Sequence, residues 1–166
     1  ISAFADKRNE RVDATAIHAT KTSWFLEKLQ SDSVKPLSYV SLGLKMAQKY
    51  GIKTGFVSTT EKATVQIIAQ KLVAEGHQGF DITTHRGLGL PEKPEPDAYI
   101  HAFEALGIKA QNAIVIEDNV DGVAAAKTAG ARVVGVPGAF ALQTDLSAAD
   151  TTFGSGSDIH WVRFFH

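Results

Sequence analysis

A four-residue apolar run that ends in two adjacent carboxylates constrains this chain more than any other stretch. The run, Ala113 to Ile116, has the length and composition of a buried strand. Glu117 and Asp118 follow it, and a helical run of small residues continues to Gly130. Carboxylates at the carboxyl end of a strand in an α/β sheet lie where such sheets place their ligands. Two close carboxylates favour a neutralising cation, and oxygen ligands suit Mg²⁺. The structural alternative is that both acids only cap the helix.

Along the rest of the sequence, predicted strands and helices alternate with a repeat of about 20–30 residues. This is the spacing of βαβ units in a parallel sheet. The expected strands are short runs between turn residues, at 52–57, 79–84, 113–116 and 131–136. The expected helices carry apolar residues at helical spacing, over 10–30, 39–50, 61–75, 96–106 and the run up to Gly130. The sequence therefore predicts an α/β fold with a parallel sheet.

Two further segments complete this outline. Ser31 to Pro36 is rich in turn residues and is the one plausible boundary in the chain. After residue 140 the pattern is mixed, and the segment from Thr152 to Asp158 is predicted to be a loop. The last aromatic and apolar residues could dock a helical turn on the core: Trp161, Val162, Phe164 and Phe165.

Length, charge and cysteine content narrow the possible functions. A chain of 166 residues suits one domain, or one domain plus a fragment of another. The net charge of −1 argues against binding to nucleic acid or a membrane surface through bulk electrostatics. The chain has no cysteine, which excludes thiolate chemistry and fits a reducing compartment. It has no apolar run of about 18 residues and no secretory leader at residue 1. We therefore expect an intracellular protein, in the cytoplasm or a plastid stroma.

Two other polar segments fall at the same edge of the predicted sheet as Glu117 and Asp118. Ser58, Thr59 and Thr60 follow the strand at 52–57, where hydroxyls and backbone amides can cap a helix or hold an anion. Lys93 lies in a stiff loop, although a single loop lysine usually faces solvent. The carboxyl ends of parallel strands converge on one edge. A hydroxyl, an ammonium group and an acid pair at that edge together predict a phosphoryl site.

The order of these motifs resembles that of the haloacid dehalogenase-like (HAD) hydrolases. The motifs are Phe56-Val-Ser-Thr-Thr60, Lys93-Pro-Glu-Pro-Asp97 and Ile116-Glu-Asp-Asn-Val-Asp-Gly122, the last running on to Gly130. The chain is most similar to the subgroup that contains β-phosphoglucomutase, phosphoglycolate phosphatase and the sugar-bisphosphate phosphatases of the Calvin cycle. The resemblance implies a Rossmann-like, three-layer parallel sheet with a small α-helical cap.

The resemblance also implies roles for the residues at the sheet edge. The position that matches Ser58 binds the phosphoryl group, with Thr59 and Thr60 beside it, and the position that matches Lys93 pairs with the nucleophile and the phosphate. Glu117 and Asp118 match positions that hold Mg²⁺, directly or through water. Asn119 stands where the family more often has serine. The implied activity is Mg²⁺-dependent phosphatase action on a small phosphorylated sugar or sugar bisphosphate, and a phosphomutase of the β-phosphoglucomutase type is the alternative.

The segment Ile17-His-Ala-Thr-Lys-Thr22 resembles the last helix of the family's cap. The resemblance implies that His18 and Lys21 face the substrate, whereas the structural alternative is a solvated helix face. We therefore expect residues 1–35 to be the remnant of a helical cap and residues 36–166 to be the core without its first strand.

The family's catalytic Asp-x-Asp element is missing from this chain, in which no two aspartates are spaced two apart. In the family, its first aspartate attacks phosphorus to give an aspartyl-phosphate, and its second acts as general acid and base. One explanation is that the sequence is a fragment, so that a separate segment or chain supplies the missing strand and the chain alone is inactive. The other is a non-catalytic subunit on the same fold. A receiver domain is disfavoured by the Lys93 motif and by the order of the motifs.

Overall fold

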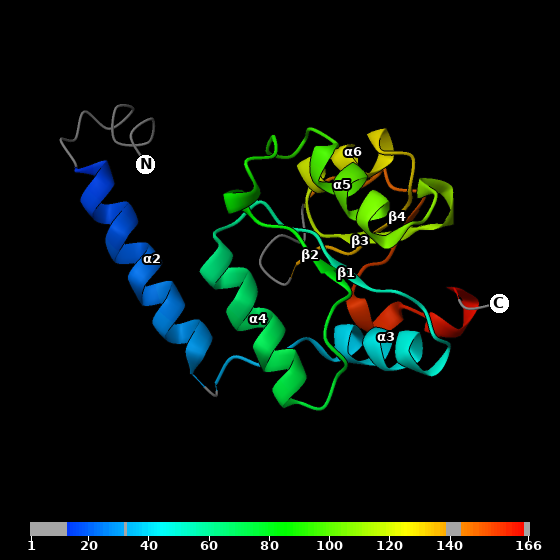
Figure 1. Cartoon of the computed structure of the whole chain (residues 1–166), viewed down its shortest axis with the longest axis horizontal. Helices are drawn as coiled ribbons and strands as arrows, with labels where there is room; N and C mark the ends of the chain where they lie inside the picture. The colour runs from blue at the N-terminus through cyan, green and yellow to red at the C-terminus, as the bar shows by residue number, and fades with distance from the viewer. Residues whose placement is uncertain (1–12, 32, 139–143, 165–166) are drawn as a thin grey trace. The chain divides into compact units, whose positions relative to one another are not determined.

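The computed structural model describes residues 13–31, 33–138 and 144–164 (Figure 1). It divides into two compact units, Ile1–Lys35 and Pro36–His166. The described part of the first unit is built on one helix, α2 (Ala14–Gln30). The Asp13 side chain caps it by accepting a hydrogen bond from the Ala16 amide at 2.9 Å, and Trp24 on this helix is 60% exposed. The assignment of this unit to a cap stays a prediction.

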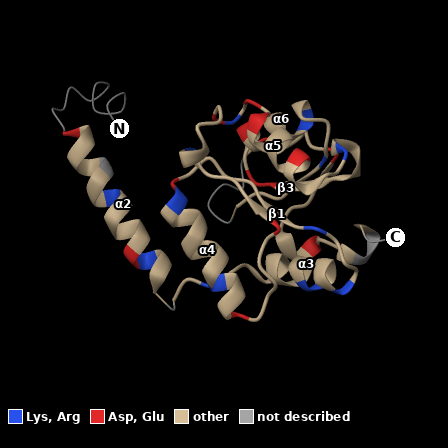
Figure 2. Ribbon diagram, in the orientation of Figure 1, with Lys and Arg blue, Asp and Glu red and all other residues tan. Residues whose placement is uncertain are grey.

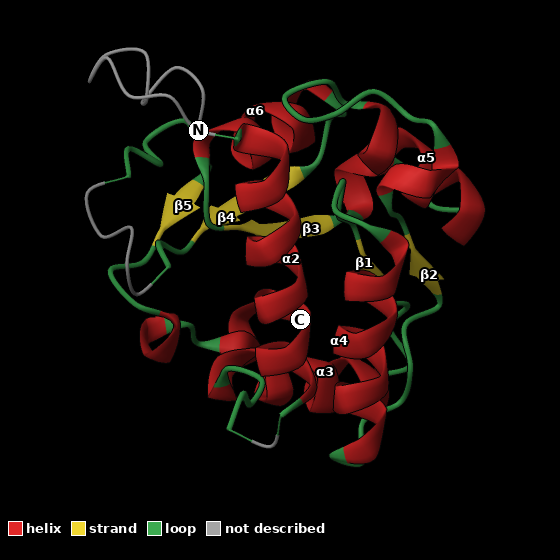
Figure 3. Ribbon diagram, turned by 90° about the vertical axis from the view of Figure 1, so that its left-hand side faces the viewer, coloured by secondary structure: helices red, strands yellow, loops and turns green. Residues whose placement is uncertain are grey.

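The second unit contains two parallel sheets (Figure 3). In the first sheet β1 (Gly55–Phe56) pairs with β2 (Ile82–Thr83). In the second sheet, β4 (Arg132–Gly135) lies between β3 (Ile114–Glu117) and β5 (Thr151–Thr152). The strands follow one another in the order β5, β4, β3, β1, β2 in Figure 3, with the break between β3 and β1. The α/β class with parallel pairing is therefore confirmed.

Three helices connect strands β1 to β4, a fourth precedes β1, and all four agree with the sequence prediction. They are α3 (Ser38–Lys49), α4 (Lys62–Ala74), α5 (Asp97–Leu106) and α6 (Val120–Thr128). The ends of α5 show why the prediction succeeds. Pro96 is its N-cap, where a missing amide proton costs nothing. Gly107 ends it at φ +64°, a left-handed conformation that glycine adopts without strain.

Two apolar clusters form the core of the second unit. The larger one packs α5 and α6 onto β3 and β4, with Phe103, Val123 and Val133 among its buried members. The smaller one gathers Val134, Val136 and Ile159, and Trp161 and Phe164 pack against it. The predicted docking of the final aromatic residues is therefore confirmed for those two side chains. The Val162 side chain and Phe165 lie outside the described residues.

The structure corrects one prediction and shortens two others. Thr152 was expected in a loop, but with Thr151 it forms β5 beside β4, so that prediction was wrong. Both threonines are exposed, and a two-residue polar strand leaves no apolar pattern to detect. The strands expected at 52–57 and 79–84 are each only two residues long, β1 and β2. Among the described residues, no helix combines the length and apolar character needed to cross a membrane.

Candidate active site

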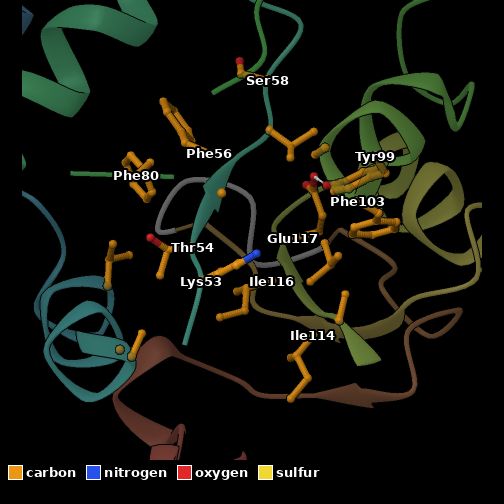
Figure 4. A pocket seen from close by; sticks show the side chains of 18 of the residues that line it. Lys53, Thr54, Phe56, Ser58, Phe80, Tyr99, Phe103, Ile114, Ile116 and Glu117 are labelled. Carbon is orange, nitrogen blue, oxygen red and sulfur yellow. Dashed lines mark hydrogen bonds between the residues drawn. The ribbon is translucent and has the colours of Figure 1, made fainter. Parts of the chain in front are cut away.

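The predicted polar residues of the second unit meet on one cavity of about 960 Å³. The cavity lies between β1 and β3, with Phe56 on one side and Ile114 and Ile116 on the other (Figure 4). Its lining includes all six polar residues that the sequence assigned to the sheet edge: Ser58, Thr59, Thr60, Lys93, Glu117 and Asp118. Acidic and basic residues are interspersed over the second unit as a whole (Figure 2). The charge pattern that distinguishes the site is therefore local.

Lys93 joins the carboxyl ends of β1 and β3. Its Nζ donates hydrogen bonds to the Val57 carbonyl oxygen at 3.2 Å, the Tyr99 hydroxyl at 3.1 Å and the Glu117 carboxylate. The ammonium also lies 4.8 Å from the centre of the Tyr99 ring. The side chain is only 12% exposed, so Lys93 is not the solvent-facing loop lysine of the structural alternative. A cis peptide bond links Lys93 to Pro94.

Glu117 is a buried carboxylate with three side-chain donors. Lys93 and the Tyr99 hydroxyl both donate to Oε1, and Asn119 Nδ2 donates to Oε2 at 3.2 Å. Burial, and then the charge of Glu117, raise the pKa of Tyr99 well above its ordinary value. Tyr99 is therefore neutral and remains a hydrogen-bond donor. A Cβ at Gly122 would lie 2.1 Å from Glu117 Oε2, so the absence of a side chain there makes room for the carboxylate.

Asp118 differs from its neighbour because it is exposed. Its Oδ1 accepts a hydrogen bond from Asn119 Nδ2 at 3.0 Å. The N-cap of α6 is Asn119, whose Oδ1 accepts the Gly122 amide at 2.8 Å. Helix capping therefore does not account for Glu117 and Asp118, and that structural alternative is wrong. The negative charge of Asp118, after burial, also raises the pKa of Tyr39, so the two side chains are electrostatic neighbours across the cavity.

The hydroxyl loop after β1 is held by a threonine at the end of β2. The buried Thr84 hydroxyl accepts the Ser58 amide and donates to the Ser58 carbonyl oxygen, both at 2.9 Å. The Ser58 Oγ accepts the Thr60 amide at 3.1 Å. The N-cap of α4 is Glu61, without a side-chain capping bond. The hydroxyls of residues 58–60 therefore do not cap this helix, and their binding of an anion stays a prediction.

An exposed arginine ties the hydroxyl loop to the Lys93 loop. The Arg86 amide donates to the Thr60 carbonyl oxygen at 2.8 Å. Its guanidinium donates to Glu61 at 3.0 Å and to Glu92, the neighbour of Lys93, at 2.9 Å. Exposed ion pairs add little stability one by one. Arg86 connects both segments that carry the predicted phosphate ligands, so it contributes to their mutual position.

The carboxylates of Glu117 and Asp118 are oxygen ligands of the kind that Mg²⁺ prefers, but only one of them is exposed. Glu117 is already paired with Lys93, whereas Asp118 is exposed beside it. No group of three or more histidine, aspartate or glutamate side chains placed to hold a metal occurs within the described ranges. Mg²⁺ keeps several waters and commonly takes only one or two carboxylates plus substrate phosphates. The exposed Asp118, next to the buried Glu117, is compatible with such a site.

Not every predicted residue belongs to this cavity, and some of its residues were not predicted. His18 and Lys21 lie on α2 in the other unit; Lys21 is exposed, and the His18 side chain lies outside the described residues. Their contact with substrate stays a prediction. Tyr99 and Thr84 were missed as site residues. A signal for Tyr99 was present, since it is the polar member of the inward face of α5 directly after the Lys93 loop.

Comparison with known proteins places the chain in a family. A family model described as haloacid dehalogenase-like hydrolase matches residues 5–130. Protein CbbY of Rhodobacter capsulatus is 30% identical over 135 residues, which are 81% of this chain and 60% of that protein. Phosphoglycolate phosphatase of Neisseria gonorrhoeae is 32% identical over 120 residues, 71% of this chain and 49% of that protein. The chain thus spans about half to three fifths of the length of these two relatives.

Solved structures support the same fold. CbbY from Rhodobacter sphaeroides in complex with phosphate matches with a TM-score of 0.77 and 25% identity, over 90% of this chain and 67% of that one. β-Phosphoglucomutase from Clostridium difficile matches with a TM-score of 0.68 and 22% identity, over 87% of this chain and 63% of that one. At this lower identity, the match with β-phosphoglucomutase shows only that the two chains share a fold.

Proposed function

The chain belongs to the haloacid dehalogenase-like hydrolases, and from that premise we propose that it forms the phosphate-binding part of a Mg²⁺-dependent phosphatase. The substrate would be a small phosphorylated sugar or sugar bisphosphate. One relative is named phosphoglycolate phosphatase, and a mutant of the CbbY structural neighbour is in complex with xylulose-(1,5)bisphosphate. The observation that carries the proposal is the buried Lys93–Glu117 pair, which stands between the hydroxyl loop and the exposed Asp118.

The residues of this chain would bind and orient the phosphoryl group. The hydroxyls of residues 58–60 would donate to phosphoryl oxygens near the start of α4, whereas the Ser58 and Thr60 amides already donate to Thr84 Oγ1 and Ser58 Oγ. The Lys93 ammonium would neutralise part of the phosphate charge. Tyr99 and Asn119 would keep Glu117 in place, and Glu117 in turn holds Lys93 near the Val57 carbonyl. The site is thereby organised before any ligand arrives.

Asp118 would be the direct protein ligand of Mg²⁺, with Glu117 acting directly or through water. The bound cation would stabilise the negative charge that develops on the phosphoryl oxygens. The nucleophilic aspartate of an aspartyl-phosphate intermediate lies outside this chain, since no Asp-x-Asp element is present. Catalysis would therefore need polypeptide beyond residues 1–166.

A substrate screen on the full-length protein tests the proposal. We expect turnover of at least one compound from a panel of sugar mono- and bisphosphates, and several orders of magnitude less for Lys93→Ala. Lys93→Ala activity within about tenfold of the unmodified protein would contradict the role of the lysine. No turnover, together with no binding of beryllofluoride in the presence of Mg²⁺, would favour the non-catalytic subunit instead, because only an intact site should bind this phosphate mimic.

The metal assignment has its own test. Asp118→Asn should weaken Mg²⁺ binding by at least about tenfold in calorimetric titration, because the exposed carboxylate is lost. Asp145→Asn is the matched control, since Asp145 is an exposed loop aspartate that accepts the Ser147 amide outside the cavity lining. Equal metal affinity in the two variants would remove Asp118 from the site.

A further inference from the structure

Asn119 makes three hydrogen bonds with its side-chain amide at the lining of the cavity. Its Nδ2 donates to Glu117 Oε2 at 3.2 Å and to Asp118 Oδ1 at 3.0 Å. Its Oδ1 accepts the Gly122 amide at 2.8 Å, as the N-cap of α6. The orientation of the side-chain amide follows from these partners, because an ionised carboxylate only accepts hydrogen bonds and a backbone amide only donates them. One neutral side chain therefore links both candidate metal ligands to the first turn of a helix.

The helix cap alone does not explain an asparagine at this position. A cap needs one side-chain oxygen, and serine, threonine and aspartate supply one as asparagine does. Serine and threonine carry a single hydroxyl hydrogen, so neither can donate to two carboxylates at once, and ionised aspartate has no hydrogen to donate. Of these four residues, only asparagine combines the capping oxygen with two hydrogens on one nitrogen. The bonds to Glu117 and Asp118 are therefore the contacts for which asparagine is required.

These hydrogen bonds leave the two carboxylates with unequal capacity for a cation. Oε1 of Glu117 accepts from Lys93 and from the Tyr99 hydroxyl. Oε2 of Glu117 accepts from Asn119, so both oxygens of this buried carboxylate already have donors. On the exposed Asp118, Asn119 takes Oδ1, and no hydrogen bond from the described residues reaches Oδ2. The oxygen best placed to meet a cation is therefore Asp118 Oδ2.

The number of oxygens that a carboxylate can offer affects which cation it prefers. Mg²⁺ demands near-ideal octahedral geometry, keeps several waters and commonly takes one or two carboxylates. Ca²⁺ is larger, takes about six to eight oxygens and often uses both oxygens of one carboxylate. With Oδ1 tied to Asn119, Asp118 can offer a second oxygen only by breaking a hydrogen bond. The arrangement therefore favours the smaller cation.

We propose that Asn119 is a positioning residue that sets the cation preference of the site, because it limits Asp118 to a single ligating oxygen. The inference rests on the proposed function, since it takes Asp118 as a ligand of the metal. Serine, expected at this position from the family resemblance, would cap the helix but leave one of the two carboxylates without a donor. The preference for Mg²⁺ over Ca²⁺ would therefore come from the asparagine of this chain.

Calorimetric titration of the full-length protein with MgCl₂ and with CaCl₂ tests the proposal. We expect the unmodified protein to bind Mg²⁺ more tightly than Ca²⁺, and Asn119→Gly to lower the ratio of the Ca²⁺ Kd to the Mg²⁺ Kd by at least about tenfold. Glycine is tolerated at an N-cap and removes both donated hydrogen bonds without adding charge. Asn112→Gly is the matched control, because Asn112 is an exposed asparagine that lines the same cavity just before β3. Its ratio should stay that of the unmodified protein.

A second variant separates the lost hydrogen bonds from other effects of the glycine. Asn119→Asp keeps an oxygen that can cap α6 but replaces the donating nitrogen by a further carboxylate oxygen. We expect it to tighten Ca²⁺ binding more than Mg²⁺ binding, because Ca²⁺ accepts additional oxygen ligands. A residue that only capped the helix would leave the ratio unchanged in both Asn119 variants, and that result would overturn the proposal. An equal fall of the ratio in Asn112→Gly, or a preference of the unmodified protein for Ca²⁺, would overturn it as well.

These measurements distinguish a failure of this proposal from a failure of the proposed function. If Asp118→Asn weakens Mg²⁺ binding while both Asn119 variants keep the unmodified ratio, Asp118 stays a ligand and only the role of Asn119 is refuted. If the unmodified protein binds no Mg²⁺, with or without beryllofluoride, both are refuted. Circular dichroism checks that each variant folds.

Infrared difference spectra of the carboxylate stretching bands give an independent readout of how Asp118 binds the cation. The Asp118 band is the one that disappears in Asp118→Asn. We expect it to report ligation through one oxygen in the unmodified protein with Mg²⁺, and through two oxygens in Asn119→Gly with Ca²⁺. Ligation of Mg²⁺ through both Asp118 oxygens in the unmodified protein would refute the proposal, because Asn119 would then not restrict the carboxylate.

Discussion

Lys93 and Glu117 form the ion pair on which the candidate site depends, and removing one member should destabilise the chain strongly. Both side chains are nearly buried, at 12% and 8% exposure. Lys93→Met keeps most of the apolar stem but takes the ammonium away from Glu117. The carboxylate would retain Tyr99 and Asn119 as donors but would have no balancing charge.

The magnitude follows from this geometry. Breaking a buried pair by removing one partner costs about 3–5 kcal/mol. We expect about 3 kcal/mol for Lys93→Met, because two neutral donors to Glu117 remain. Glu117→Gln should cost less, about 1–2 kcal/mol, since Lys93 keeps the Val57 carbonyl and reaches the cavity. The double variant should recover about 1–3 kcal/mol relative to the sum of the two.

Urea unfolding followed by circular dichroism measures these differences as shifts of the midpoint at constant slope. Lys127→Met is the matched control, because Lys127 pairs with Asp150 at 2.6 Å but both side chains are well exposed. Solvent screens such a pair, so the control should change stability little. Additive effects of Lys93→Met and Glu117→Gln would refute the reasoning, because independent residues cannot form the buried pair described above.

Two further predictions concern the surroundings of Glu117. The pKa of Tyr99 is raised above its ordinary 10.0, by burial and then by Glu117, so an unfolded chain releases this proton at lower pH than the folded one. Stability should therefore fall as the pH rises above about 10, and Tyr99→Phe should flatten that part of the profile in urea titrations. An unchanged slope would contradict the raised pKa. Gly122→Ala should cost about 1–3 kcal/mol, because its Cβ would overlap the Glu117 carboxylate. Gly154→Ala, whose nearest neighbour would lie 3.8 Å away, is the control, and equal unfolding midpoints would contradict the close packing.

The parts of the fold that follow from local rules were predictable from the sequence. Pro96 and Gly107 mark the ends of α5 because each has a backbone preference that acts without its neighbours. Ala113 to Ile116 marks β3 because a short apolar run needs only burial to become a strand. The convergence of Ser58, Lys93 and Asp118 on one cavity also follows, since strand ends meet at one edge in any parallel sheet.

The remaining features depend on contacts that the sequence does not encode locally. The pairing of β5 with β4 places two exposed threonines in a strand that has no apolar pattern. The bond from Tyr99 to Glu117 joins residues 18 positions apart on a helix and a strand. From the sequence alone, a tyrosine at that position is equally consistent with a residue of the site and with a residue of the apolar core. Only the three-dimensional arrangement separates the two hypotheses.

The balance of charge at the end of the cavity that carries Lys93 gives a physical reason for a cation. Among the described residues that line this end, Lys93 is opposed by Glu117, Asp118 and Asp121. The other basic residues that line the cavity, Lys53 and Arg132, lie at its opposite end. There Lys53 donates a hydrogen bond to the carbonyl oxygen of Leu106, the last residue of α5. A phosphate dianion brought to Ser58 would therefore meet a net negative rim, which repels it. If Lys93 moved from Glu117 to the phosphate, the buried Glu117 carboxylate would lose its balancing charge, which costs free energy. We therefore expect phosphate binding to depend on an additional positive charge near Asp118, and the two binding events to be coupled.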